Sequence, residues 1–182
     1  MLVIDCCVRG DVSTTRRYYQ AYLQKYAPQN VTVLELSKQN LAPVDAAYLQ
    51  QRDALRYAGE FLNAFFDLAR QFRDADEILI AASYWDLSFP ALLKIYLEYV
   101  AVCDLTFGYN AEGQAEGYCR AKQLLYFSSC GGYVGEQHLG YDYIRAFADM
   151  LGIHDCKAYM LEGMDIDPSK REKLLAEAIA RL

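Results

Sequence analysis

The chain has 182 residues, of which 54% are hydrophobic and 23% charged, a balance typical of a folded domain rather than a disordered segment. Its formal net charge of −6 argues against a nucleic-acid partner, because polyphosphate binding requires a basic face. No apolar run reaches the length of a membrane span and no secretory signal is visible, so we expect one cytoplasmic domain over residues 1–182 without a membrane partner.

The hydrophobic pattern predicts strands and helices in strict alternation. Short apolar or alternating runs predict strands at 2–5, 31–36, 78–82, 123–128 and 156–161. Helical spacing predicts helices at 18–26, 55–73, 90–102, 141–151 and 170–182, the second of them long and amphipathic. The segments 37–44, 104–120 and 162–168 are expected to be loops, the last of them a solvated connection.

This order is typical of a parallel sheet with helices on both faces and right-handed crossovers. Five strands fit an α/β fold of the flavodoxin-like type, a three-layer α/β/α sandwich with strand order 2-1-3-4-5. In that order the strands at 2–5, 78–82 and 123–128 are neighbours. The loops that follow them, at 6–15, 83–89 and 129–133, are therefore expected to meet at one crevice, where ligands bind in open α/β sheets.

The loop at 83–89 joins a buried strand to an amphipathic helix and carries two aromatic side chains and a carboxylate. Pro90 suits the first turn of that helix, and Ser88 is its predicted N-cap. The aromatic side chains could lie flat against a planar ligand, or they could fill the core; the sequence leaves both interpretations open.

The loop at 6–15 ends in Ser13, Thr14 and Thr15 at a predicted helix N-terminus. Free backbone N–H groups, hydroxyls and the helix dipole favour an anion there, and Arg9 adds positive charge, so one phosphate fits the loop. The alternative is that Ser13 or Thr14 is only an N-cap. The chain contains neither a P-loop motif nor a G-x-G-x-x-G motif.

The loop at 129–133 contains Gly131 and Gly132, which let the backbone approach a flat ligand closely. Tyr133 could cover such a ligand or donate a hydrogen bond to it, although paired glycines also mark ordinary surface turns. Taken together, the three loops suit a phosphorylated planar cofactor, for which FMN is the candidate.

The segments 82–94, 105–109 and 129–133 carry a family resemblance. They read A-S-Y-W-D-L-S-F-P-A-L-L-K, L-T-F-G-Y and S-C-G-G-Y, and they resemble the flavodoxin-like NAD(P)H:quinone oxidoreductase and FMN-dependent NADH-azoreductase family. The resemblance implies a homodimer with FMN near the subunit interface. It also implies ping-pong transfer of two electrons from NADH or NADPH through the flavin to a small-molecule acceptor such as a quinone or azo compound.

The resemblance further implies roles for individual residues. It assigns Arg9, Ser13, Thr14 and Thr15 to the phosphate, Tyr84, Trp85, Asp86 and Leu87 to the flanks of the flavin ring, Ser129, Cys130, Gly131 and Gly132 to the other edge of the ring, and Phe107 and Tyr109 to the acceptor pocket. Because the flavin itself accepts the hydride, no catalytic protein residue and no metal site are predicted, and the cysteines lack the C-x-x-C spacing of metal sites.

The chain departs from the family pattern at three places. Cys6 and Cys7 stand where the family often has Gly-Ser or Ser-Ser, Ser83 replaces a proline, and Asp86 replaces an asparagine. We hypothesise that the Asp86 carboxylate lowers the flavin potential; the alternative is that it caps the following helix.

The sequence is compatible with more than one role for the thiols and for the whole chain. One of Cys6, Cys7 and Cys130 could be redox-active, or all could be buried and inert thiols. The chain could also be a flavodoxin-like electron carrier rather than an enzyme, or an interaction domain without cofactor.

Overall fold

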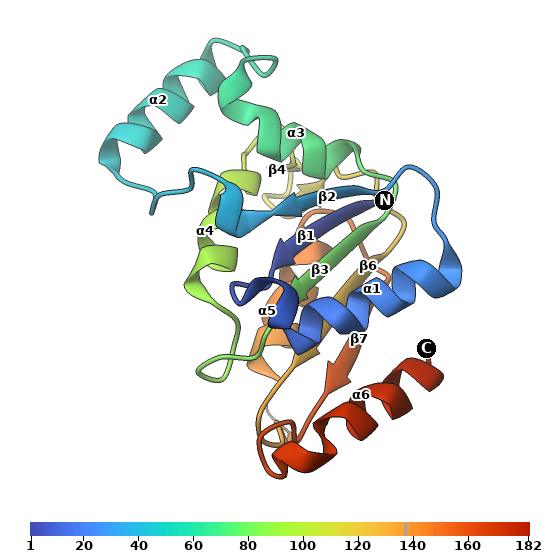
Figure 1. Ribbon diagram of the computed structural model, residues 1–182. Coiled ribbons are helices and arrows are strands. Elements are labelled where there is room, and N and C mark those ends of the chain that lie inside the picture. Colours follow the sequence, from blue (N-terminus) through green and yellow to red (C-terminus); the bar gives the residue numbers. More distant parts are fainter. Residues whose placement is uncertain (137) are drawn as a thin grey trace.

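The computed structural model describes residues 1–136 and 138–182 and has a five-stranded parallel sheet between two layers of helices (Figure 1). The strands of this sheet are β1 (Leu2–Cys6), β2 (Thr32–Glu35), β3 (Ile78–Ala82), β6 (Leu124–Ser129) and β7 (Cys156–Leu161). Their order is β2-β1-β3-β6-β7. Counted along the sheet's own strands this is 2-1-3-4-5, so the predicted flavodoxin-like fold and strand order are confirmed.

Helices cover both faces of the sheet. The helices are α1 (Thr14–Tyr26), α2 (Ala46–Tyr57), α3 (Asp67–Asp74), α4 (Ala91–Val100), α5 (Leu139–Met150) and α6 (Arg171–Ala180), with short 3₁₀ turns η1 (Gly10–Val12), η2 (Leu36–Lys38), η3 (Ala64–Phe66) and η4 (Pro168–Lys170). Figure 1 shows α1 and α6 in front of the sheet, α3, α4 and α5 behind it, and α2 projecting away from it.

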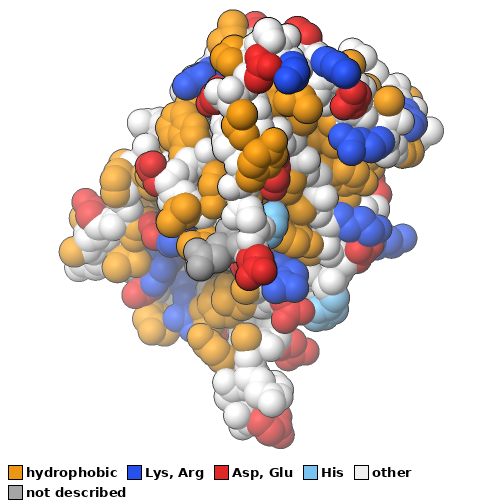
Figure 2. Space-filling model, turned by 90° about the horizontal axis from the view of Figure 1, so that it is seen from below, with side chains coloured by type: hydrophobic (Ala, Val, Ile, Leu, Met, Phe, Trp, Pro, Cys, Tyr) orange, Lys and Arg blue, Asp and Glu red, His pale blue; other side chains and the backbone are white. Residues whose placement is uncertain are grey.

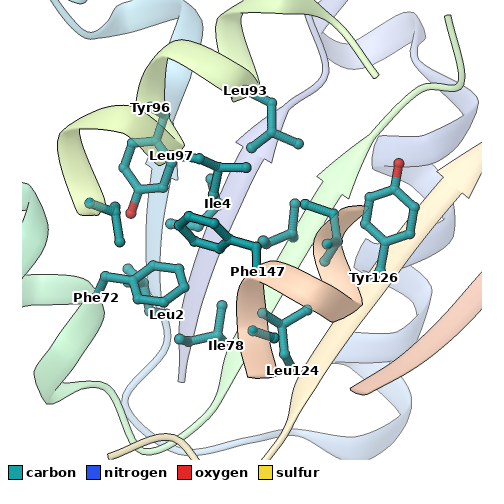
Figure 3. Packing of buried hydrophobic residues seen from close by; sticks show 14 of the residues in the cluster. Leu2, Ile4, Phe72, Ile78, Leu93, Tyr96, Leu97, Leu124, Tyr126 and Phe147 are labelled. Atoms are coloured by element: carbon teal, nitrogen blue, oxygen red, sulfur yellow. The ribbon is translucent and has the colours of Figure 1, made fainter. Parts of the chain in front are cut away.

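The central strands are buried on both faces, which explains their uninterrupted apolar sequences. Every residue of β1 and β3 is buried. On the face covered by α3, α4 and α5, the core includes Ile4, Ile80, Phe72 and Tyr96 (Figure 3). Each such side chain stabilises the fold by about 1.5–3 kcal/mol relative to an exposed position, so the core holds the ends of these strands, and the loops beyond them, in place.

The predicted single helix at 55–73 is wrong, because the chain forms two helices there. The first, α2, begins after Asp45, whose side chain accepts a hydrogen bond from the Tyr48 N–H at 2.8 Å. It ends before Gly59, which has a left-handed φ of 72°. Asn63 then caps η3 by accepting from the Phe65 N–H at 3.0 Å, and α3 follows. The apolar spacing runs across this break because both segments contact one small hydrophobic cluster.

Two further local predictions need correction. The segment 104–120 is not only a loop, because β4 (Phe107–Tyr109) and β5 (Ala115–Gly117) form an antiparallel hairpin within it. Ser88 is not the N-cap of α4, because Pro90 occupies that position and has no side-chain group to cap with. Ser88 instead pairs through its backbone with Trp85.

Within 1–136 and 138–182, no helix combines the length and the apolar composition that a membrane crossing needs. The same residues contain no cluster of His, Cys, Asp or Glu side chains arranged to hold a metal ion. All six cysteines are free thiols.

Candidate functional site

A cavity of about 310 Å³ lies where the loops after β1, β3 and β6 meet. Its lining residues are Arg9, Val12, Ser13, Thr14, Ser83, Tyr84, Trp85, Ser129, Cys130, Gly131, Met164, Asp165 and Arg171. Ser13, Trp85 and Gly131, one from each of the three predicted loops, therefore share one cavity, as the strand order requires.

The first loop leads into α1 and places the N-terminus of this helix, the positive end of its dipole, at the cavity. Ser13 is the N-cap of α1, and its hydroxyl accepts a hydrogen bond from the Arg16 N–H at 3.3 Å. The N-cap interpretation is therefore correct for Ser13, yet Ser13 and Thr14 also line the cavity together with Arg9. Because the first N–H groups of a helix have no partner within it, this wall suits an anion.

Thr15 does something other than line the cavity. It is fully buried, and its hydroxyl hydrogen-bonds to the Ser129 hydroxyl at 2.7 Å and to the Ser83 hydroxyl at 3.2 Å. One side chain thus joins the loops after β1, β3 and β6. The replacement of a proline by Ser83 provides one of these partners.

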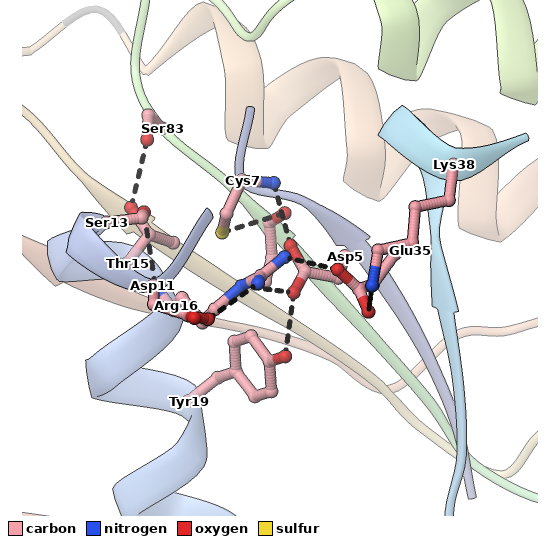
Figure 4. Close-up of polar contacts among 11 residues, drawn as sticks. Asp5, Cys7, Asp11, Ser13, Thr15, Arg16, Tyr19, Glu35, Lys38 and Ser83 are labelled. Carbon is pink, nitrogen blue, oxygen red and sulfur yellow. Dashed lines mark hydrogen bonds and ion pairs between the residues drawn. The ribbon is translucent and has the colours of Figure 1, made fainter. Parts of the chain in front are cut away.

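A buried charge network fixes the first loop from behind (Figure 4). The Asp5 carboxylate is 2% exposed, accepts hydrogen bonds from the Cys7 N–H and the Tyr19 hydroxyl, each at 2.8 Å, and pairs with Arg16 at 2.8 Å. Arg16 also reaches Asp11 at 3.1 Å. Its Nη2 pairs with the carboxylate of Glu35, the last residue of the neighbouring strand β2, at 3.0 Å. Burial lowers the pKa of Arg16, but these carboxylates more than offset that effect, so its pKa is raised and it stays charged.

The second loop is a strained two-residue hairpin. The Trp85 N–H donates to the Ser88 carbonyl at 3.1 Å, and the Ser88 N–H donates to the Trp85 carbonyl at 2.8 Å. Between them Asp86 and Leu87 have φ values of 49° and 67°. Such turns favour Asn-Gly, and a leucine in the left-handed region is costly. Strain of this kind is typical of functional sites.

This hairpin presents an aromatic ring to the cavity. Trp85 is 40% exposed, and Tyr84 beside it is half-buried; both line the cavity rather than the core. Asp86 and Leu87 are exposed and lie outside the lining. The alternative that Asp86 caps α4 is wrong, since Pro90 occupies the N-cap position of that helix.

The third loop is paired with a segment that the sequence interpretation missed. The Gly163 N–H donates to the Gly132 carbonyl at 2.8 Å. The Met164 N–H donates to the Cys130 carbonyl at 3.1 Å, and the Asp165 N–H donates to the Gly131 carbonyl at 2.9 Å. This pairing brings Met164, Asp165 and Arg171 into the cavity wall. The segment 162–168 is therefore part of the site and not only a solvated connection. No motif marked it, because its place depends on how two loops pair.

One glycine of this loop packs directly against the Asp165 side chain. A Cβ on Gly131 would overlap the Asp165 carboxylate, whereas a Cβ on Gly132 would meet nothing within 4 Å. Gly132 and Tyr133 are exposed and lie outside the lining.

The predicted acceptor-pocket residues lie elsewhere. Phe107 and Tyr109 belong to β4, whose partner strand β5 contacts Leu151 and Gly152, just before β7 begins. That is the amino end of the sheet, and the cavity is at the carboxyl end, so neither residue lines the cavity of its own chain.

Burial raises the pKa of the thiol that lines the cavity and of the two buried thiols after β1. Burial, and secondly the charge of Glu162, raise the pKa of Cys130 to about 11. Burial, followed by Asp5, raises the pKa of Cys6 to about 12 and also raises that of Cys7. Since the thiolate is the reactive form, these shifts favour inert thiols over redox-active ones.

The chemistry of the donors in this cavity fits the cofactor class that the sequence suggests. The wall near α1 offers two hydroxyls, a helix N-terminus and Arg9 to a phosphate, and Arg171 adds a second guanidinium. Tyr84 and Trp85 offer flat surfaces to a ring. A phosphorylated planar group therefore matches the residues present.

Comparisons with known proteins agree with this match. A family model described as flavodoxin-like fold matches residues 1–182. The FMN-dependent NADH:quinone oxidoreductase of Clostridium perfringens is 30% identical over 174 residues, which cover 93% of this chain and 88% of that protein. The protein of the same name from Bacillus pumilus is 28% identical, with 97% and 90% covered.

Solved structures share the fold. The azoreductase of Bacillus anthracis superposes with a TM-score of 0.84 at 21% identity, covering 99% of this chain and 94% of that one. An FMN-dependent NADH-azoreductase of the same organism, in complex with FMN, has a TM-score of 0.80 at 18% identity, with 99% and 95% covered.

Proposed function

The chain belongs to the flavodoxin-like fold family that matches its whole length, and from this premise we propose that it is an FMN-dependent NAD(P)H oxidoreductase of the quinone reductase or azoreductase type. Relatives of both kinds, named for quinone and for azo compounds, are similar to it over nearly their full length. The substrate class is accordingly a small electron acceptor. The cytoplasm is its proposed location, because NAD(P)H is available there.

The observation that carries this proposal is the shared cavity of Ser13, Trp85 and Gly131. A flavin nucleotide needs an anion site, a stacking surface and a backbone that approaches its ring closely, all within one ligand length. The three loops meet these needs together. In this proposal the α1 N-terminus binds the phosphate, and the aromatic pair of the second loop flanks the ring.

The chain's own residues bind and orient the reactants, and no acid–base group is required of them. FMN, when bound, supplies the centre that accepts a hydride and passes it on. Thr15 keeps the three loops at fixed separations through its hydrogen bonds to Ser83 and Ser129. The Asp5–Arg16 ion pair keeps the phosphate loop in its binding conformation before any ligand arrives.

Asp86 is proposed to tune the flavin. It is exposed in the hairpin beside Trp85 and caps no helix, so its charge is free to act on a ring bound against the aromatic pair. A carboxylate there disfavours the anionic reduced flavin. We expect Asp86→Asn to raise the midpoint potential, measured by anaerobic dye titration; an unchanged potential would remove this role from Asp86.

A homodimer is proposed to complete the acceptor pocket. An apolar groove of about 320 Å³ runs between α4 and α5, lined by Lys94, Leu97, Glu98, Ala101, Tyr143, Ala146, Phe147 and Met150. The two charged residues on its rim, Lys94 and Glu98, pair with each other within the chain, so the groove between them presents an apolar strip without an unpaired charge to a two-fold related copy.

The direction of α4 suggests how such a dimer would bring residues of one copy to the cavity of the other. This helix begins just after the cavity's second loop, and the β4–β5 hairpin follows its other end. A two-fold axis across the groove exchanges these ends, which would bring Phe107 and Tyr109 of one copy toward the cavity of the other. Figure 2, which views the molecule from below Figure 1, shows hydrophobic and charged side chains interspersed on that face, without one continuous apolar patch.

The dimer is tested by sedimentation equilibrium of the wild type and of Ala146→Arg. Ala146 is exposed and lines the groove. Gln20→Arg, at an exposed site on α1, adds the same charge to the opposite layer. We expect Ala146→Arg alone to give monomers that keep FMN and lose quinone reduction. A monomeric wild type, or dissociation by both variants, would contradict the proposal.

The proposed reaction is tested by an absorption spectrum of the purified protein with added FMN, followed by anaerobic NADH and then a quinone. We expect a yellow protein that NADH bleaches and the quinone recolours, with steady-state turnover. Flavin that binds but is not reduced by NADH would indicate an electron carrier instead. A protein that stays colourless with excess FMN would indicate an interaction domain.

A further inference from the structure

Arg171 is the one cation in the cavity wall that comes from outside the three predicted loops, among the residues that the structure describes. It opens α6, at the far end of the chain from Arg9. We propose that Arg171 binds the phosphate of the flavin nucleotide and thereby makes the site select FMN over riboflavin. This inference rests on the proposed function, because it concerns the same cavity.

The Arg171 guanidinium is held in place on one edge. Its Nε–H donates to the Met164 carbonyl at 3.1 Å, and its Nη2 pairs with the Asp165 carboxylate at 2.5 Å. Both partners sit in the loop that pairs with Gly131 and its neighbours. The guanidinium has further N–H groups beyond these two contacts, and a donor that is oriented in advance loses little entropy when it binds an anion.

The residue next to Arg171 ties the start of α6 to the start of α1. Glu172 accepts two hydrogen bonds from Arg17, each at 2.7 Å. Arg17 lies in the first turn of α1 and Glu172 in the first turn of α6, so this bidentate pair joins the two helix N-termini. The start of α6 is therefore tied to the start of α1, and Arg171, Ser13 and Thr14 line the same cavity.

The charges of the cavity also favour this role. Its lining contains the cations Arg9 and Arg171 and the anion Asp165, in a chain of net charge −6. Arg171 neutralises Asp165, which would otherwise oppose a phosphate, and still has N–H groups to offer. A guanidinium is suited to phosphate because its planar donors match two oxygens at once.

The test compares FMN with riboflavin, which differ only in the phosphate. Flavin fluorescence titration gives the Kd of each for the wild type, Arg171→Gln and Lys170→Gln. Lys170 is the matched control, since it carries the same charge one residue earlier, is exposed and lies outside the lining. Loss of one charge-assisted hydrogen bond predicts a Kd for FMN about tenfold weaker or more in Arg171→Gln.

The Kd for riboflavin is expected to change less than twofold in Arg171→Gln, and Lys170→Gln is expected to leave both values unchanged. Equal weakening of both flavins by Arg171→Gln would overturn the inference, because it would show a structural role only. The same loss in Lys170→Gln would overturn it too, as a general charge effect. Arg171→Lys is measured in every case, because Arg171→Gln also leaves the Asp165 charge without its partner. Arg171→Lys keeps that charge balance, so an unchanged preference for FMN over riboflavin in it would overturn a directional contact. It also replaces Arg171→Gln if circular dichroism shows that variant unfolded.

This result is separable from the proposed function. A wild type that binds neither flavin removes the function and this inference together. A wild type that binds FMN, with an unaltered preference in the Arg171 variants, removes the inference alone.

Discussion

Removing the charge of the Arg16 side chain should lower the free energy of unfolding more than a substitution at an exposed residue nearby. Arg16→Met keeps an unbranched chain of similar reach but leaves the Asp5 carboxylate, 2% exposed, without its cation. The Asp5 carboxylate would keep only the hydrogen bonds from the Cys7 N–H and the Tyr19 hydroxyl. Breaking a buried ion pair on one side costs about 3–5 kcal/mol, since a charge is then buried uncompensated.

The two remaining donors put the expected loss near the lower end, at about 3 kcal/mol. For a chain of this length, such a loss lowers Tm by about 8 °C, taking about 2 cal/mol/K of unfolding entropy per residue. It is also a large part of the about 5–15 kcal/mol that holds a typical domain folded. The loop that carries the phosphate-binding groups should loosen first, because Asp5 binds its first N–H.

The assay is urea unfolding followed by circular dichroism, with matched m values as the condition for comparison. Arg17→Met is the control, one residue further on. Its ion pair with Glu172 is largely exposed, so its loss should have a much smaller effect. Adding Asp5→Asn to Arg16→Met should restore part of the stability by removing the stranded charge. Equal losses in the two single variants, or no recovery in the double variant, would refute a buried ion pair that is coupled in this way.

Three other outcomes follow from the local geometry. Gly131→Ala should displace the carboxylate that holds Arg171 and weaken FMN binding severalfold in a fluorescence titration, whereas Gly132→Ala should leave the Kd unchanged; equal effects would contradict the tight approach at Gly131. Leu87→Val should lower the free energy of unfolding by about 1 kcal/mol relative to Leu87→Gly in urea titrations, because a β-branched residue tolerates the left-handed region least. Cys130, whose pKa burial raises to about 11, stays protonated below that pH, so its alkylation by iodoacetamide, followed by mass spectrometry, should rise about tenfold per pH unit between pH 7 and 10; fast alkylation at pH 7 would show a reactive thiol.

The amino-acid sequence by itself predicted the strands and a parallel sheet, and the order 2-1-3-4-5 came with the flavodoxin-like topology that five such strands fit. Continuous apolar runs such as Ile78–Ala82 are typical of strands buried on both faces, and their alternation with helices favours the parallel arrangement. That order then dictated which loops meet. Ser13, Trp85 and Gly131 could be placed in one cavity from the sequence because the strand ends carry them there.

Apolar spacing could not locate the break between α2 and α3. Residues on both sides of Gly59 contact the same cluster, so the periodic pattern continues through a turn that the backbone makes. The β4–β5 hairpin was hidden for another reason. Its close contact with the end of α5 depends on Gly117, where any Cβ would overlap the Leu151 backbone, and no local signal reports such a contact.

The finer chemistry of the site was decided by tertiary structure. Whether a hydroxyl binds a ligand or another side chain depends on its neighbours: Thr15 turned inward to Ser129, while Thr14 lines the cavity. Arg171 enters the wall only because two loops pair through their backbones, an interaction that is independent of side-chain identity and therefore leaves no mark in the residue pattern. Local patterns fix which elements form and in which order, whereas contacts between distant loops fix which groups face the ligand.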